Sequence, residues 1–210
     1  MILADIGNTR VHIYQNGKVI HLSHREAINL YGDKRVYYIT VKRELEKTLK
    51  SLKNWIDISN KITLKGAYET MGVDRKALCL SYSTGLFISA GTAITVDIVE
   101  DSIYKGGFLL LGLKEHLRGY ANISPALKSD LNRDIDLDKL PKSTRDGISY
   151  SIISSIKMVI EKHQNNKQIY ISGGDGKFIS SLLKNAIFDE TLIFKGMKKA
   201  IRVNFYVNIL

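Results

Sequence analysis

Two short turns that contain glycine are the segments of this chain whose residue types could bind a phosphate. The first turn is Asp5–Thr9, with the sequence Asp-Ile-Gly-Asn-Thr, and the second is Ser89–Thr95, with the sequence Ser-Ala-Gly-Thr-Ala-Ile-Thr. Glycine permits a tight turn, so backbone N–H groups and small hydroxyls can approach a phosphate closely. Two such turns predict a nucleotide held in a cleft between two related halves of the chain.

Three further features admit both a chemical and a purely structural explanation. The pair Asp74-Arg75 begins an amphipathic helical pattern, where it could be an N-terminal charge followed by a solvated arginine. Asp5 could cap its own turn, and Gly173-Gly174 could be an ordinary turn from strand to helix. Taken alone, these residues leave both explanations open.

The hydrophobic pattern predicts the elements that must position these turns, in the order β-β-β-α-β-α-β-α in each half. In the first half we predict strands at 2–6, 11–14, 19–22, 35–40 and 61–64, and helices at 24–30, 42–54 and from Val73. In the second half we predict strands at 86–90, 94–99, 103–111, 168–172 and 191–194, and helices at 113–121, 144–163, 176–185 and after Gly196. The polar segment 127–144 has no clear period, which favours a loop or a surface that packs on a partner subunit.

Composition narrows the class of protein. The chain has 210 residues, 44% hydrophobic, which is ample for a buried core. No apolar run is long enough to span a membrane, no secretion signal is evident and Cys79 is a single cysteine, so we expect a cytoplasmic protein without a disulfide. The net charge of +10 comes from lysines scattered along the whole chain, so we expect ATP or another small anion, rather than nucleic acid, as the partner.

Four segments, in this order, resemble the motifs of the type III pantothenate kinases, members of the acetate/sugar kinase–Hsp70–actin superfamily. Asp5–Thr9 is similar to the family's first phosphate motif, and Gly72–Arg75 to its Gly-x-Asp-Arg motif. Gly91–Thr95 is similar to the second phosphate motif, and Ile171–Gly174 to the adenosine motif. The resemblance implies an α/β protein with the duplicated ribonuclease H-like (actin-like ATPase) fold, its two halves being residues 1–84 and 85–210.

The resemblance also implies an activity, the ATP-dependent phosphorylation of pantothenate to 4′-phosphopantothenate, which is the first step of coenzyme A biosynthesis. Asp74 would accept the proton of the pantothenate hydroxyl, Arg75 would bind the substrate's polar oxygens, and Asp5 would orient Mg²⁺ through water. The residues implied to bind ATP are Asp5, Ile6, Gly7, Asn8, Thr9, Arg10, Val11, His12, Thr92, Gly173 and Gly174, with Thr95 as a further phosphate donor. The residues implied to bind pantothenate are Tyr68, Gly72, Val73, Asp74, Arg75 and Thr144.

Thr144 carries two interpretations. It resembles a family threonine that reaches the pantothenate of a neighbouring subunit, which implies a homodimer with its interface in the region 100–165. Threonine is also a good helix N-cap, and residue 144 stands where a helix is predicted to begin.

The chain departs from the family pattern in three places. Ser89 stands where the family has an aspartate that helps to bind a monovalent cation, and a neutral hydroxyl attracts a cation less strongly. The need for K⁺ or NH₄⁺ is therefore an open question, with Asp97 as an alternative ligand. The segment Gly106–Gly112 lacks the family's proline, and the spacing from Tyr68 to Gly72 is short, which leaves the substrate pocket open. Two alternatives follow: a kinase of another small alcohol, or a nucleic-acid-linked accessory factor of transcription.

Overall fold

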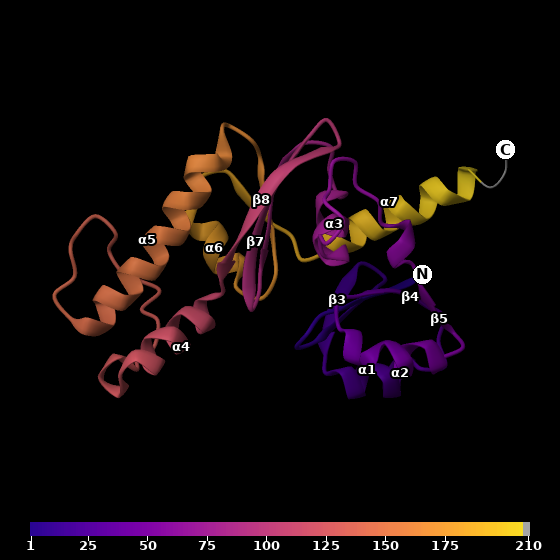
Figure 1. Cartoon of the computed structure of the whole chain (residues 1–210), viewed down its shortest axis with the longest axis horizontal. Helices are drawn as coiled ribbons and strands as arrows, with labels where there is room; N and C mark the ends of the chain where they lie inside the picture. The colour runs from indigo at the N-terminus through magenta and orange to yellow at the C-terminus, as the bar shows by residue number, and fades with distance from the viewer. Residues whose placement is uncertain (208–210) are drawn as a thin grey trace. The chain divides into compact units, whose positions relative to one another are not determined.

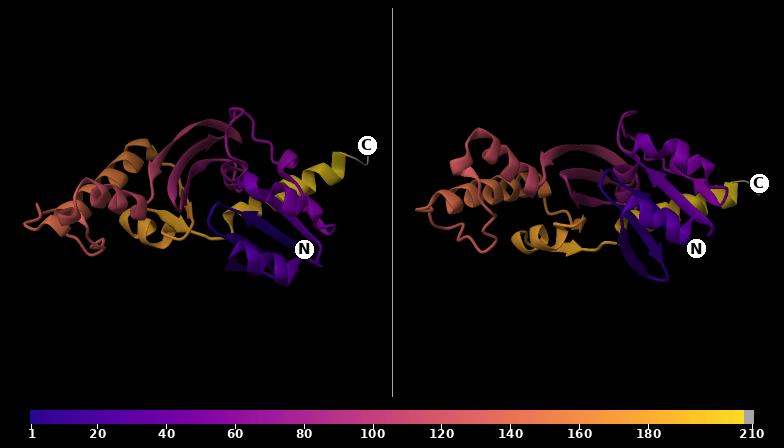
Figure 2. Two further views of the ribbon diagram at one scale, coloured as in Figure 1. Left: turned by 60° about the horizontal axis from the view of Figure 1, so that its bottom comes forward. Right: turned by 90° about the horizontal axis from the view of Figure 1, so that it is seen from below.

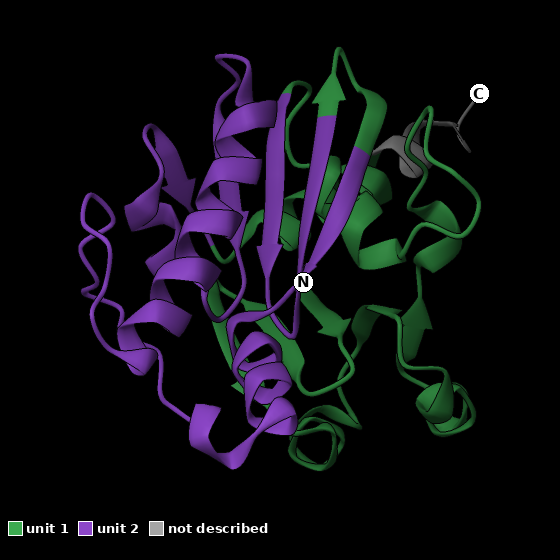
Figure 3. Ribbon diagram, turned by 60° about the vertical axis from the view of Figure 1, so that its left-hand side comes forward, with its two compact units in different colours: residues 1–84, 99–106, 190–210 green, residues 85–98, 107–189 purple. Residues whose placement is uncertain are grey.

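The computed structural model describes residues 1–207, which form two compact units (Figure 3). Unit 1 contains residues 1–84, 99–106 and 190–207, and unit 2 contains residues 85–98 and 107–189. The sequence pattern divides the chain once, after residue 84; contacts in the structure also group 99–106 and the last helix with the first unit.

Unit 1 is built on a five-stranded sheet whose strand order is β3-β2-β1-β4-β5. Its strands are β1 (Ile2–Ile6), β2 (Val11–Gln15), β3 (Lys18–Leu22), β4 (Val36–Thr40) and β5 (Trp55–Asp57). The first three strands are antiparallel neighbours, and β4 and β5 add on parallel to β1. The β2–β3 hairpin turns through Asn16 and Gly17, which both have positive φ, as the predicted Asn-Gly turn requires.

Helices cover both faces of this sheet. They are α1 (His24–Tyr31), α2 (Glu46–Ser51), α3 (Val73–Cys79) and α7 (Leu192–Val207), with 3₁₀ turns at Arg43–Leu45 and Ser59–Lys61. One face packs against α1 and α2, which lie beside each other in Figure 1, through a core that includes Ala27, Tyr31 and Leu49. The other face packs against α3 and α7 through a core that includes Ala77 and Phe194. Burial of both faces explains why β1 and β4 are almost uniformly apolar.

Unit 2 repeats the arrangement of unit 1. Its strands are β6 (Gly85–Ala90), β7 (Ala93–Glu100), β8 (Ile103–Leu111), β9 (Ile169–Ser172) and β10 (Ala186–Phe188), in the order β10-β9-β6-β7-β8. The order is the same as in unit 1 when the strands of each unit are numbered from its first strand and the second list is read backwards. Strand β9 pairs in parallel with β6, and β10 pairs in parallel with β9. The predicted duplicated α/β fold is therefore confirmed.

The helices of unit 2 are α4 (Leu113–Ile123), α5 (Thr144–Gln164) and α6 (Gly176–Leu182), with a 3₁₀ turn at Pro125–Leu127. All three contribute to one core on the sheet, to which α5 supplies a row of buried isoleucines and α6 supplies Ile179. Residues 128–143 contain no helix or strand and form an open loop before α5 (Figure 2), as the polar segment predicts.

Two predicted strands are wrong. Residues 61–64 form no strand: β5 lies earlier, and Ile62 and Leu64 are apolar because they are buried in the core. Residues 191–194 are not a strand either, because Leu192 begins α7 and the last strand is β10. The helix predicted at 42–54 is shorter, with a 3₁₀ turn followed by α2. In the described part of the chain, no helix is both long enough and apolar enough to cross a membrane.

Candidate active site

The first phosphate turn joins β1 to β2. The amide of Gly7 donates to the carbonyl oxygen of Arg10 at 3.0 Å, which closes the turn. Two side chains from other elements hold its outer carbonyls: His24 Nε2 lies 2.9 Å from the oxygen of Gly7, and Lys42 Nζ donates to that of Asn8 at 2.9 Å. Asn8 and its two successors are exposed. The turn is therefore braced from behind while its polar residues face solvent, as a phosphate-binding turn needs.

Asp5 lies near the end of β1 and is only 6% exposed. Burial of the carboxylate, followed by the charge of the nearby Asp74, raises the pKa of Asp5 to about 8. A cation beside this pair would offset both causes of the shift.

Asp74 lies in the first turn of α3, directly after the helix begins at Val73. Its Oδ1 lies so close to the backbone of Gly72 that a Cβ at that position would be 2.5 Å from the oxygen. Residue 72 is therefore a glycine because a side chain would not fit there, and not because of its backbone conformation, since its φ of −53° is open to other residues. The sequence Gly-x-Asp thus lets the carboxylate of Asp74 fold back over the start of its own helix.

Arg75 is buried, with 6% of its surface exposed, so the explanation of a solvated arginine is wrong. Its Nη1 donates to the hydroxyl of Tyr68 at 2.6 Å, and its Nη2 to the hydroxyl of Tyr104 at 3.5 Å. The two tyrosine rings are 6.1 Å apart. The guanidinium is therefore held by two phenols, one predicted from the family and one not.

Tyr104 is the site residue that the sequence analysis missed. It lies on β8, and its amide donates to the carbonyl of Lys65 at 2.8 Å, next to a parallel bridge between Lys65 and Ile103. This bridge brings β8 beside the segment that carries Tyr68. In the sequence, Tyr104 is marked only as an aromatic residue two positions before a Gly-Gly pair. This pattern does not indicate a contact with Arg75, 29 residues away.

Unit 2 brings together the second phosphate turn and the turn at Gly173-Gly174, here named the adenosine turn after the motif that it ends. The amide of Gly91 donates to the oxygen of Ala93 at 3.1 Å, and Thr92 is exposed in this turn. Gly173 has a φ of +97°, and a Cβ there would lie 2.4 Å from the oxygen of Ala90. Only glycine allows the adenosine turn to lie this close to the end of β6. The amide of Asp175 reinforces the contact with a 3.1 Å hydrogen bond to the same oxygen.

The segment Gly106–Gly112 contains the end of β8 and the residue before α4, so no loop replaces the missing proline. The amide of Gly112 donates to the oxygen of Thr92 at 2.8 Å, so this segment supports the second phosphate turn from behind. Ser89, Thr95 and Asp97 lie on the face of the sheet opposite the core face of Ile88, Ala90, Ile94 and Val96. Thr95 is 8% exposed, and its hydroxyl has no hydrogen-bond partner among the described residues.

Two predicted residues have different surroundings from the rest. Thr144 is exposed and is the first residue of α5, whereas the N-cap is Ser143, whose hydroxyl accepts from the amide of Asp146 at 3.1 Å. The N-cap interpretation of Thr144 is therefore wrong.

His12 pairs with His21 across the β2–β3 hairpin, with their Nδ1 atoms 2.6 Å apart. Burial, then the charges of His21 and Arg10, lowers the pKa of His12 to about 4.

Unit 1 therefore contains Asp5, Asp74, Arg75 and both tyrosines, and unit 2 contains the second phosphate turn, the adenosine turn and Thr144. Among residues 1–207 no three histidine, cysteine or carboxylate side chains form a group that could hold a metal ion by themselves. These residues supply a buried carboxyl group near a partly buried one, an ordered guanidinium and glycine turns, which suit phosphoryl transfer to an alcohol.

Comparison with known proteins agrees with these parts. The sequence profile described as type III pantothenate kinase matches residues 35–165. The type III pantothenate kinase of Campylobacter jejuni is 37% identical over 204 residues, 97% of this chain and 98% of that protein. The kinase of the same name from Wolinella succinogenes is 39% identical over 202 residues, 96% of each.

Two solved structures are also similar. A Campylobacter jejuni protein that carries the name of a Baf family transcriptional activator has a TM-score of 0.89 and 35% identity, covering 97% of this chain and 98% of that one. The activator of the 2-hydroxyisocaproyl-CoA dehydratase from Clostridium difficile, with bound ADPNP, has a TM-score of 0.56 and 12% identity, over 98% of each chain. The second likeness shows the fold alone. The sequence relatives, which match almost end to end, show that this chain belongs to the type III pantothenate kinase family and is a kinase.

Proposed function

We propose that this kinase transfers the γ-phosphoryl group of ATP to the primary hydroxyl of pantothenate, giving 4′-phosphopantothenate and ADP for coenzyme A biosynthesis. The observation that carries the proposal is the grouping of Asp74, Arg75 and Asp5 in unit 1. Family membership supports the substrate, and this grouping supports the roles of the residues.

Asp74 is the general base in this proposal. As the hydroxyl oxygen forms its bond to the γ-phosphorus and the bond to ADP breaks, the hydroxyl proton passes to the carboxylate of Asp74. Two features support the assignment. Gly72 leaves room for the carboxylate at the start of α3, and the charge of Asp74 is one cause of the raised pKa of Asp5, so the two carboxyl groups lie near each other.

Arg75 binds the carboxylate of pantothenate in this proposal. A planar guanidinium suits a carboxylate or amide oxygen better than a lysine does, because its donors form a fixed fork. The two phenols orient that fork before substrate arrives, so less side-chain entropy is lost on binding. Tyr68, which is 45% exposed, is placed to contact substrate as well.

The buried Asp5 fits a hydrated Mg²⁺. Its carboxylate is costly to ionise where it lies, next to a second carboxylate, and a divalent cation would remove that cost. Bound Mg²⁺ would neutralise charge on the ATP phosphates. The residues proposed to bind ATP remain those of the first turn and β2, Asp5 to His12, together with Thr92, Gly173 and Gly174. Thr95, whose buried hydroxyl has no hydrogen-bond partner within the part of the chain that the structure describes, is a further donor.

Asp97 is the proposed ligand of a monovalent cation in place of the family's aspartate. It is fully buried and lies on the same face of the sheet as Ser89. Asp97→Asn is expected to remove the difference between rates in K⁺ and Na⁺, whereas Ser89→Asp is expected to enlarge it. Equal rates of the unaltered enzyme in both salts would contradict a cation role for Asp97.

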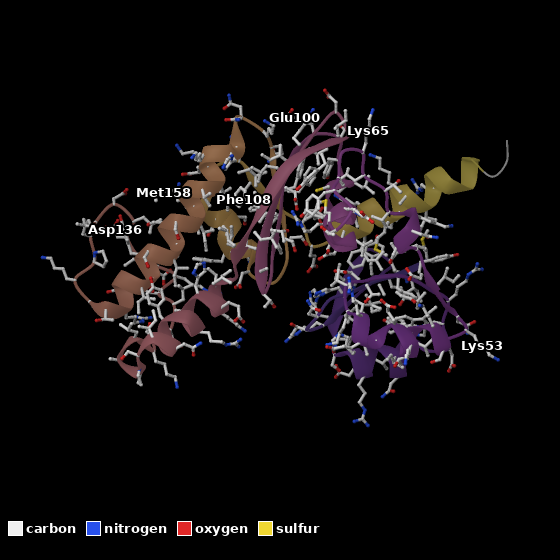
Figure 4. All side chains as sticks on the ribbon, viewed as in Figure 1. Lys53, Lys65, Glu100, Phe108, Asp136 and Met158 are labelled. Atoms are coloured by element: carbon white, nitrogen blue, oxygen red, sulfur yellow. The ribbon has the colours of Figure 1, made fainter. Side chains whose placement is uncertain are left out.

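We also propose a cytoplasmic homodimer. Unit 2 exposes large apolar side chains, namely Leu109 and Leu111 on the edge strand β8 and Met158 on α5. Figure 4 labels Met158. Large apolar side chains that are exposed in this way favour an interface with a second copy. Thr144, exposed and not used as a cap, would then reach the partner's pantothenate.

The experiment that tests the proposal is a coupled ADP-release assay with Mg-ATP and pantothenate. Asp74→Asn is expected to remove pantothenate-dependent turnover while leaving ATP binding intact. Glu69→Gln is the matched control, because it alters an exposed carboxylate five residues away. Loss of activity in both variants, or in neither, would contradict the role of Asp74. Competition among small alcohols in the same assay separates pantothenate from another substrate.

A second candidate function is DNA binding in transcription. The net charge of +10 and the name of the similar Campylobacter structure favour it. It predicts binding that weakens steeply with salt and that does not change in Asp74→Asn. Pantothenate-dependent turnover together with no salt-sensitive DNA binding would exclude this second function.

A further inference from the structure

The loop 128–143 is tied to two helix starts of unit 2 through two consecutive residues, Asn132 and Arg133. The amide of Asn132 donates to the hydroxyl of Ser149 at 2.8 Å, and its side-chain Nδ2 donates to Asp146 at 2.8 Å. Ser149 is fully buried in α5, so the backbone of the loop is fixed at this point. The backbone of the next residue, Arg133, is therefore held in place.

The side chain of Arg133 extends from this point of the loop to the adenosine turn. Its Nη2 donates to Asp175 Oδ1 at 2.8 Å, and its guanidinium lies 4.6 Å from the centre of the Phe178 ring on α6. Asp175 stands at the N-cap position of α6 but makes no capping hydrogen bond with its side chain. A side chain that would ordinarily cap its helix is instead directed to an arginine 42 residues away.

This contact joins the nucleotide turns of unit 2. Asp175 follows Gly173-Gly174, and its amide is bonded to the oxygen of Ala90, which is the last residue of β6 and lies within the second phosphate turn. Movement of Asp175 would therefore move the adenosine turn relative to the phosphate turn. The ion pair adds little to global stability, because Arg133 is half exposed and such pairs are screened by water.

We propose that Arg133 is a positioning residue for ATP: through Asp175 it fixes the distance between the adenosine turn and the second phosphate turn. The proposal rests on ATP binding at these turns, which belongs to the proposed function. Its expected effect is on nucleotide affinity, because Arg133 contacts Asp175, which directly follows Gly173-Gly174, whereas Asp74 and Arg75 lie in unit 1.

The test is the affinity for ATP, measured by titration calorimetry, beside the KM values for ATP and pantothenate. Arg133→Ala and Asp175→Asn are each expected to weaken ATP binding about fivefold, the upper range for a half-exposed ion pair. The KM for pantothenate and the melting temperature should stay unchanged, and Arg133→Lys should recover part of the affinity. Arg118→Ala is the matched control, because Arg118 forms a 2.9 Å exposed ion pair with Glu115 elsewhere in unit 2.

A double variant with the charges exchanged, Arg133→Asp with Asp175→Arg, should bind ATP more tightly than either single exchange. The proposal is overturned if Arg133→Ala and Arg118→Ala bind ATP equally well, or if ATP and pantothenate KM values rise together with a fall in melting temperature. Calorimetry keeps this result separate from the proposed function: normal ATP binding without pantothenate turnover contradicts the substrate alone. No binding of ATP by the unaltered protein would overturn both.

Discussion

Substitution of Gly72 by alanine should separate catalysis from stability. A Cβ at this position would lie 2.5 Å from Asp74 Oδ1, about 0.9 Å inside ordinary van der Waals contact. The backbone at Gly72, with φ −53° and ψ 139°, is accessible to alanine, so the chain can fold and the carboxylate is what must move. The substitution is therefore expected to displace the carboxylate of Asp74, the proposed base, by nearly 1 Å.

The expected magnitude follows from that displacement. A misplacement of about 1 Å costs about 100-fold in kcat, or about 2.7 kcal/mol of transition-state stabilisation. The cost to stability should stay below about 1 kcal/mol, since alanine is only a poorer N-cap than glycine. For a chain of this size that corresponds to a fall in Tm of at most about 4 °C.

The assay is steady-state ADP release with saturating ATP and pantothenate, beside thermal unfolding of the same samples. Gly119→Ala is the control, because a Cβ at that site on α4 meets nothing within 4 Å. Alanine there should leave kcat unchanged and raise stability slightly. Full kcat in Gly72→Ala would refute the argument that the glycine exists to accommodate the proposed base, and so would a loss of activity explained by unfolding.

Three other outcomes are expected. Arg75→Lys should raise the KM for pantothenate at least about tenfold with little change in the KM for ATP, because lysine loses the fork that the two phenols orient; equal KM values for pantothenate would contradict this. Without Mg²⁺, stability against urea should fall as pH rises toward about 8, because folded Asp5 keeps a proton that the unfolded carboxyl has lost. Asp5→Asn should remove this decline. The comparison is made above pH 6.5, because protonation of His12 lowers stability as pH falls toward about 4. An unchanged slope of stability against pH in Asp5→Asn would contradict the argument that burial raises the pKa of Asp5. Leu109→Glu should convert a dimer into a species near the 23.7 kDa of one chain on gel filtration, and an unaltered protein that already elutes there would exclude the homodimer.

The sequence was sufficient for the order of elements and for the glycine motifs, because both are local. Alternation and helical spacing identify β1 to β4 and β6 to β9, and Asn16-Gly17 identifies its hairpin. The errors fell on short elements. Strand β5 has three residues, too few for a period to show, and Ile62 and Leu64 resemble a strand because they are buried.

The site was predictable only in part for a related reason. Asp5, Asp74 and Arg75 stand in recognisable motifs, but the partners that set their chemistry come from distant segments. The pairing of Tyr104 with Arg75 depends on a single bridge between β8 and residue 65. Arg133, which contacts Asp175, lies in an irregular loop that has no hydrophobic period from which the path of the chain could be predicted. Pairings of this kind are fixed by tertiary structure and leave no local pattern.

The packing of α7 against α3 has a consequence for the order in which the protein can be made. The helix that carries Asp74 and Arg75 packs on a helix of residues 192–207, and Gly196 lies directly against the backbone of Ala77. During synthesis, the segment that completes this core leaves the ribosome after all of unit 2. Until then α3 packs on that face of the sheet without α7, and a nonsense codon near residue 190 would remove the part of the core that supports the helix of the proposed base.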